Sequence, residues 1–370
     1  MKDLCIIALL GRRDEPTDAL EEYCRYLGGA LHDRGFAMEL ARVPWAERGW
    51  TSALRELREK AHEWRGKWVL LQYTALAWSA RGFPLGFLRV VKVLRESGAR
   101  VAIVYHDVEP FSGSRWIDAM RRRAQLHVMQ QALTAANLGI FTVPLDVISW
   151  LGKSHSSATF IPVGANLPVE TVTPAKSVET DQAPLRVAVF GITEGETGRT
   201  ECVRIVEAVG HAAARGGPVR LHAFGRGTLE CESELRKALE GVAVELHVEG
   251  ILPADLVVKA LSASDVMLFV RAPISSRRGS AIAGIACGLP VIAYSGPETA
   301  APITEAGVLL VSPGNNAELG EALLRVMSDA PFRESLAERS RQAQRNHFSW
   351  NAIAERYVEA LGQQEKDSPA

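Results

Sequence analysis

The chain has 370 residues, 42 Lys and Arg against 43 Asp and Glu, and a net charge of -1, so nothing in its overall charge indicates binding to nucleic acid. With 47% hydrophobic residues it is long enough for two hydrophobic cores, and we expect two domains. The five cysteines are odd in number and show no CxxC or Cys/His ligand spacing, so the sequence suggests neither a disulfide framework nor a zinc site.

Six apolar runs that end in turn residues alternate with segments of helical periodicity in the first half of the chain. They cover residues 4–11, 37–43, 68–73, 100–107, 138–144 and 158–164. Such near-continuous apolar strands between helices are typical of a parallel sheet covered on both faces. The first run is too short for a signal peptide or a membrane helix, so a cytoplasmic protein is expected. Residues 1–167 carry 22 Lys and Arg against 17 Asp and Glu, a net charge of +5 that suits either peripheral binding to a membrane or ordinary solvated helix faces.

A change in composition separates the two halves. The segment 168–184 is rich in Pro, Thr, Glu and Asp and is predicted to be a linker. Strand-like runs then resume at residues 185–191, 219–225, 244–250, 266–270, 290–294 and 307–311. The pattern predicts an α/β fold class with two doubly wound Rossmann-like domains facing a cleft, 1–167 and 185–345, followed by a last segment, 346–370.

From Leu185 onward, six ordered motifs resemble the nucleotide-sugar-binding domain of GT-B glycosyltransferases of the family 4 type. They are LRVAVFG, LHAFGRG, VELHVEGIL with LSASDVMLFV, AGIACGLPVIA, AGVLLVSPGNNAELGEALLRVMSD and HFSWNAIAERYVEAL. The first half resembles the acceptor domain of that family less closely, through YHD and FIPVGANLP. The resemblance implies a nucleotide-diphosphate-sugar donor held by the second domain and an acceptor held by the first. It also implies that the helix in 346–370 returns to pack on the first domain.

The chain departs from the family where two glutamates eight positions apart usually stand, because those positions hold Ser275 and Ala283. At the start of the same helix lie Arg277, Arg278, Gly279 and Ser280. Guanidinium groups beside the N-terminus of a helix suit a diphosphate, with Ser280 as a good N-cap. The alternative is an ordinary helix cap with two solvated arginines. Glu298, beyond the next strand, is a possible replacement for the missing carboxylate.

Further donor contacts are expected from the loops that follow the strands of the second domain. By resemblance, Arg199 supplies a positive charge to the donor phosphates, and Gly191, Arg226 and Ile251 lie in neighbouring loops, where Arg226 is equally compatible with an ordinary turn. No DxD pair offers a magnesium site, so we expect a metal-independent reaction, and no cofactor other than the nucleotide sugar.

Candidate catalytic residues follow the fourth strand of the first domain. A His-Asp pair at a strand end, His106 and Asp107, can position the donor sugar or act as a general base, although a lone histidine is often structural. Candidate acceptor contacts are Arg12 and Arg13 of the first loop, which could instead belong to the cap of the helix that starts near Asp18. Further candidates come from the third strand and the loop after it, for which burial in the core is the alternative: Gln72, Tyr73 and Trp78.

The sequence therefore favours a hexosyltransferase-like glycosyltransferase that acts on a hydroxyl of a glycan, a lipid or a metabolite. The alternative is a protein of the same fold that binds a nucleotide sugar or serves as a scaffold without catalysis, as the loss of both glutamates allows. A dinucleotide-dependent oxidoreductase is disfavoured, because no GxGxxG follows the first strand of either domain.

Overall fold

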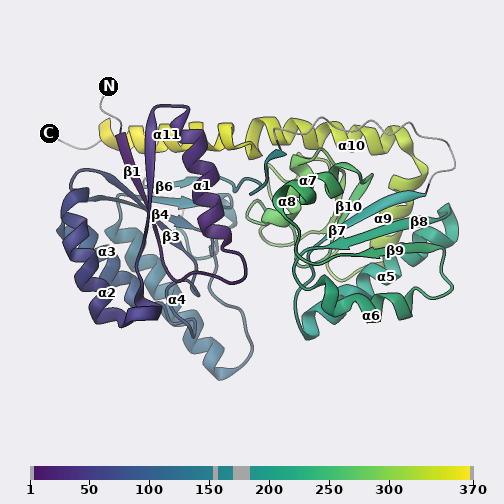
Figure 1. The fold of residues 1–370 in the computed structure, drawn as a ribbon, viewed down its shortest axis with the longest axis horizontal. Helices are drawn as coiled ribbons and strands as arrows, with labels where there is room; N and C mark the ends of the chain where they lie inside the picture. Colours follow the sequence, from purple (N-terminus) through teal and green to yellow (C-terminus); the bar gives the residue numbers. More distant parts are fainter. Residues whose placement is uncertain (1–3, 153–156, 170–183, 367–370) are drawn as a thin grey trace. The chain divides into compact units, whose positions relative to one another are not determined.

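Each half of the chain forms its own six-stranded parallel sheet (Figure 1). The structure is a computed structural model that describes residues 4–152, 157–169 and 184–366. The chain divides into a first unit, residues 1–162 with 350–370, and a second unit, residues 163–349. The units end at residues 162 and 349, against 167 and 345 in the predicted boundaries, and most of the predicted linker, 168–184, lies outside the described residues.

The first unit has strand order β2-β1-β3-β4-β5-β6. Helices α2, α3 and α4 cover one face of the sheet, and α1 packs beside α11 (Figure 1). All six predicted strands are present, within a few residues at their ends. The elements are β1 (Leu4–Leu10), α1 (Ala19–His32), β2 (Phe36–Arg42), α2 (Trp45–Ala61), η1 (His62–Trp64), β3 (Trp68–Tyr73), α3 (Gly86–Glu96), β4 (Arg100–Tyr105), α4 (Trp116–Ala135), β5 (Leu138–Phe141), η2 (Leu145–Val147), β6 (Ala158–Phe160) and α11 (Trp350–Lys366).

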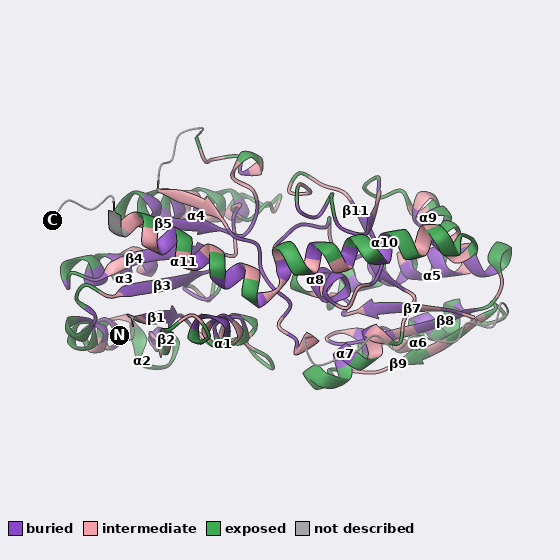
Figure 2. Ribbon diagram, turned by 90° about the horizontal axis from the view of Figure 1, so that it is seen from above, coloured by how far each residue is buried: buried purple, intermediate pink, exposed green. Residues whose placement is uncertain are grey.

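The second unit has strand order β12-β11-β10-β7-β8-β9, and again all six predicted strands are present. Helices α5, α6 and α9 contribute to the core on one face. The central strands of each unit are buried, and the helices turn exposed faces outward (Figure 2). The elements are β7 (Leu185–Phe190), α5 (Glu196–Gly216), β8 (Val219–Phe224), α6 (Thr228–Ala238), β9 (Val244–Val248), α7 (Ala254–Ser262), β10 (Val266–Phe269), α8 (Gly279–Ala286), β11 (Val291–Tyr294), β12 (Val308–Val311), α9 (Asn316–Ser328), α10 (Ala330–Ala343) and the π-helical turn η4 (Gln344–Phe348). The predicted fold class, two doubly wound α/β domains, is confirmed.

The last helix completes the first unit. The side chain of Trp350, at the start of α11, stacks on Tyr26 of α1 at 5.6 Å between ring centroids. Further along, the hydroxyl groups of Tyr23 and Tyr357 form a buried hydrogen bond of 2.8 Å. Burial raises the pKa of both phenols, so each stays protonated at neutral pH and can donate to the other. The final helix thus joins the first unit through aromatic packing and one buried polar contact.

We expect Tyr357→Phe to destabilise the first unit, because it leaves the Tyr23 hydroxyl buried without its partner. The cost of such a group is about 1–3 kcal/mol. The double variant Tyr23→Phe/Tyr357→Phe should lose less than the sum of the two single variants, because no polar group then remains unsatisfied. Urea unfolding, followed by tryptophan fluorescence, measures these differences. Equal midpoints for the wild type and Tyr357→Phe would contradict the assigned contact.

Candidate functional site

The carboxyl ends of β7 and β10 form the switch point of the second sheet. These two strands are neighbours, but the chain leaves β7 toward β8 and leaves β10 toward β11, so their loops diverge. Gly191, directly after β7, has φ of 79°, a conformation that favours glycine. An open parallel sheet binds its ligands at such a point. The predicted donor-binding loops after β7 and β10 therefore start at one place.

The loop after β7 is held by a buried carboxylate. Glu201 of α5 is fully buried and accepts hydrogen bonds from the backbone N–H and the hydroxyl of Thr193, at 2.8 and 2.7 Å. The neighbouring loop after β8 packs closely on it. The N–H of Ile192 donates to the carbonyl of Arg226, and a Cβ on Gly227 would lie 2.2 Å from the Ile192 carbonyl oxygen. These contacts fix the backbone on one side of the switch point.

Arg271, which the sequence analysis did not single out, lies at the switch point itself. It follows β10, and its Nη1 would lie 3.2 Å from a Cβ placed on Gly191. Within the described ranges, no hydrogen bond or ion pair occupies the Arg271 guanidinium. Its position directly after a predicted strand was the signal that could have found it. A guanidinium at this point can bind an anion.

The predicted arginine loop is joined to Glu298. Arg277 donates two hydrogen bonds to its carboxylate, at 2.7 and 2.8 Å, and Ser275 donates a third at 3.1 Å. Burial raises the pKa of Glu298, but the bonds from Arg277 and Ser275 and the charge of Arg278 outweigh it, so the net pKa is lowered. The carboxylate thus lies beside Ser275, one of the two positions where the resemblance implies a glutamate.

The start of α8 differs from the prediction in one respect. The helix begins at Gly279 with Arg278 as its N-cap, so Ser280 lies inside the first turn and is not the cap. No side chain among the described residues caps this helix. A Cβ on Gly279 would meet nothing within 4 Å. Gly279, the first residue of α8, is exposed, so this helix start next to two arginines suits an anionic ligand.

Other predicted donor contacts have more ordinary surroundings. The side chain of Arg199 is 74% exposed and pairs with Glu234 of α6 at 3.3 Å, as expected of a surface arginine. Ile251 is exposed after β9. Arg226 is half-buried, and its backbone carbonyl bonds to the loop after β7.

In the first unit the predicted His-Asp pair follows β4. His106 Nε2 lies 2.8 Å from Oε1 of Gln72, whose amide nitrogen is oriented by the carbonyl of Leu70 at 3.4 Å. Because Oε1 can only accept, Nε2 of His106 is the donor in this contact. Asp107 accepts a hydrogen bond from the backbone N–H of Ala75 at 2.8 Å. The pair is thus linked to the end of β3 from two sides.

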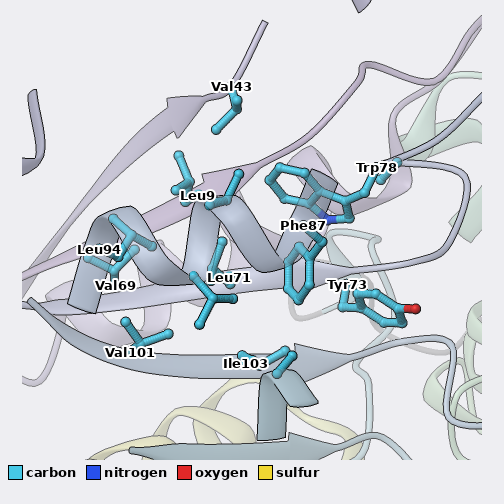
Figure 3. Close-up of a cluster of buried hydrophobic side chains, with 14 of the residues drawn as sticks. Leu9, Val43, Val69, Leu71, Tyr73, Trp78, Phe87, Leu94, Val101 and Ile103 are labelled. Atoms are coloured by element: carbon cyan, nitrogen blue, oxygen red, sulfur yellow. The ribbon is translucent and has the colours of Figure 1, made fainter. Parts of the chain in front are cut away.

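The predicted acceptor contacts separate into buried and accessible groups. Gln72, Tyr73 and Trp78 are fully buried, and the two aromatic side chains lie in the hydrophobic core of the first unit with Phe87 (Figure 3). This burial favours their packing role over contact with an acceptor, and it leaves Gln72 as the residue that orients His106.

The first loop of this unit is partly occupied by its own ion pairs. Arg13 pairs with Glu21 at 3.0 Å, and the N-cap of α1 is Asp18. Arg42 donates to Gly11, Asp18 and Glu21 and so fixes the loop after β1. Arg12 is half-buried beside it, with its N–H bonded to the carbonyl of Ala77. Arg12 therefore stays a candidate for the acceptor side, whereas Arg13 serves at least partly to hold the helix start.

Both the sequence and the structure of this chain are similar to those of known proteins. Residues 197–329 match the family described as glycosyl transferases group 1. No curated protein matches the chain by sequence.

Solved structures match the chain over its whole length. One is HepE of Anabaena in complex with UDP and glucose, with 16% identity, a TM-score of 0.67, and coverage of 97% of this chain and 100% of that chain. A glycosyltransferase of Rickettsia africae has 12% identity, a TM-score of 0.69 and full coverage of both chains. A UDP-N-acetylglucosamine 2-epimerase, named as putative, of Listeria monocytogenes has 13% identity, a TM-score of 0.63, and coverage of 99% and 98%.

These structures share the arrangement found here, two Rossmann-like units with all the described sheets parallel. The structural likeness covers nearly the whole chain, whereas the family match covers residues 197–329, in the unit that holds the arginine loop. The chain therefore has the GT-B fold, and residues 197–329 of its second unit match the glycosyl transferases group 1 family.

Proposed function

We propose that the chain transfers a hexosyl group from a nucleoside-diphosphate sugar to an acceptor hydroxyl, without a metal ion at the diphosphate and without a further cofactor. The observation that carries this proposal is the uncapped start of α8, with Arg277 and Arg278 beside it, in the domain that matches the transferase family. Fold alone does not decide the reaction, since an epimerase of UDP sugars has the same architecture.

The donor diphosphate would lie at the carboxyl edge of the second sheet. Departure of a nucleoside diphosphate builds up negative charge, which the α8 backbone N–H groups and the guanidinium of Arg271 are suited to stabilise. Arg278 adds a positive charge at the same helix start. Since Arg277 is already joined to Glu298, it serves chiefly to hold that carboxylate next to Ser275. The Glu298 carboxylate would then accept hydrogen bonds from donor hydroxyl groups.

The first unit would supply the acceptor and the proton-transfer group. His106, which Gln72 holds in place, would act as the general base for the acceptor hydroxyl. Asp107 anchors the backbone after β3 and so sets the position of His106. Arg12 is the basic residue of the first loop that we assign to the acceptor.

Binding of the donor is tested by thermal unfolding of the protein with UDP, GDP and ADP, and with NAD as a control. UDP comes first because the similar HepE structure contains it. A ligand at 100 times its Kd stabilises the folded protein by about 2.7 kcal/mol. We expect Arg271→Gln to raise the Kd of the nucleotide about 10-fold to 100-fold, the effect of losing one charge-assisted hydrogen bond. Arg236→Gln, an exposed arginine of α6, is the matched control.

If no nucleoside diphosphate raises the melting temperature, the proposed donor site is wrong. Binding that Arg271→Gln and Arg236→Gln weaken equally would show that the nucleotide lies elsewhere.

Catalysis is tested with His106→Asn. We expect the turnover of the bound nucleotide sugar, including its slow hydrolysis, to fall about 10²-fold to 10⁴-fold, the range for loss of a general base. The nucleotide Kd should stay unchanged, because the second unit holds the diphosphate. His62→Ala, an exposed histidine outside the site, is the control. Unchanged turnover in His106→Asn would assign this histidine to structure, and absence of turnover in the wild type with intact binding would favour a non-catalytic protein.

We also propose that the first unit binds peripherally to an anionic membrane. No helix in the described part of the chain has the length and apolarity needed to cross a membrane. The start of α4 and the loop before it expose three large apolar side chains, Phe111, Trp116 (75% exposed) and Met120. Arg122 and Arg123 are exposed on the same helix. Aromatic and apolar groups next to arginines are suited to the interface of an anionic bilayer.

We expect the protein to sediment with vesicles that contain phosphatidylglycerol and to stay in solution with pure phosphatidylcholine. The variant Trp116→Ser/Met120→Ser should bind the anionic vesicles at least about 10-fold less, because two buried apolar side chains are worth about 1.5–3 kcal/mol each. Leu229→Ser, an exposed leucine of α6 in the second unit, is the control. Equal sedimentation of all three proteins would exclude this surface.

A further inference from the structure

Two histidines and a glutamate meet on one face of the second sheet, near its edge. His222 of β8 and His247 of β9 are register partners on these neighbouring parallel strands. Glu249 follows His247 by two residues, so its side chain points to the same face. Their ligand atoms, one from each residue, all lie within 4.8 Å of one another. This cluster has no role in the proposed transfer of a sugar.

The distances within the cluster are close to those of a metal site. One oxygen of Glu249 lies 2.7 Å from Nε2 of His222 and 3.6 Å from Nε2 of His247. Around a tetrahedral zinc ion with bonds of about 2.0–2.1 Å, two ligand atoms lie about 3.3 Å apart. The two separations that involve Glu249 lie on either side of this value, and all three ligand atoms lie within 4.8 Å of one another, so side-chain rotations could bring them around one ion.

The surroundings hold the ligands in place and leave a path for an ion. The ring of His222 packs against the buried ring of Phe224, with 4.8 Å between centroids. The side chains of His222, Glu249 and His247 are 22%, 37% and 60% exposed, so one side of the cluster is open to solvent. On the same two strands, Arg220 forms an ion pair with its register partner Glu245, with 2.8 Å between Nε and Oε2. Arg220 therefore does not compete with an ion for Glu249.

We propose that His222, His247 and Glu249 bind a zinc ion, with water as the fourth ligand. Two imidazoles and one carboxylate suit zinc and related transition metals, whereas magnesium and calcium prefer sites made of oxygen ligands. The ion would join the edge strand β9 to β8 through side chains, in addition to their backbone ladder.

The position of the site gives the ion a structural effect on nearby loops. The carbonyl of Glu249 accepts a hydrogen bond from the hydroxyl of Thr228, at 2.5 Å, and the next residue, Gly250, accepts one from the N–H of Gly225 at 2.8 Å. The loops after β8 and β9, which hold Arg226 and Ile251, begin there. A metal bound at Glu249 would therefore stabilise the start of both loops.

The test is zinc binding by the full chain, without a polyhistidine tag and after treatment with a chelator, measured by isothermal titration calorimetry at pH 7.5. We expect one zinc ion per chain, no binding of Mg²⁺, and a higher melting temperature with zinc. His247→Ala and Glu249→Gln should each weaken zinc binding by at least about 10-fold to 100-fold. Mutation of a residue that only hydrogen-bonds to a metal ligand already lowers metal affinity by this much, and loss of a ligand should cost no less. Both side chains are partly exposed, so these variants should keep the fold.

His127→Ala, an exposed histidine of α4, is the matched control and should bind zinc as the wild type does. Cobalt substitution gives a second readout, since a tetrahedral Co²⁺ site has intense visible absorption that His247→Ala should lose. Zinc binding below one ion per chain, or equal affinity in the wild type, His247→Ala and Glu249→Gln, would overturn the proposal. These outcomes are independent of nucleotide binding, so the zinc site and the proposed function can fail separately.

Discussion

The parallel arrangement of the strands is the constraint on which the rest of the structure depends. In a parallel sheet every connection must return across a face, so all strands of one unit end at the same edge. Residues far apart in sequence are thereby collected at that edge. In the second unit this edge gathers Gly191, Arg226, Arg271 and the arginine loop before α8; in the first unit it gathers His106, Asp107 and the loop after β1. The fold thus determines where chemistry is possible before any side chain is specified.

Side chains that hold the loops, rather than ligands, account for much of the polar chemistry at these edges. Glu201 is buried to fix the loop after β7, and Arg42 serves the loop after β1. Glu298 is held by Arg277 and Ser275, which places a carboxylate beside one of the two positions where the resemblance implies a glutamate. An arginine that is paired with a carboxylate inside the protein attracts an anionic ligand less strongly than an unpaired one. The groups suited to bind an anion are therefore Arg271 and the first backbone N–H groups of α8.

The strands could be predicted from the sequence almost completely, because apolar runs between turn residues are a local signal. The site could be predicted only in part. Tyr73 and Trp78 follow a buried strand just as a binding surface would, and only the three-dimensional packing shows that they lie in the core. Arg271 was overlooked because one arginine after a strand carries no pattern. His222 and His247 are 25 residues apart, and their proximity comes from strand register, which spacing along the chain does not reveal.

The return of the chain into the first unit has a consequence for biosynthesis. The second unit is continuous, residues 163–349, whereas the first needs α11, which is made last. At a synthesis rate of about 5–20 residues per second, the ribosome needs roughly 10–40 s to translate the intervening residues. During that time the face of α1 that carries Tyr23 and Tyr26 lacks its partner helix. The first unit can therefore be completed only after the second unit has been translated.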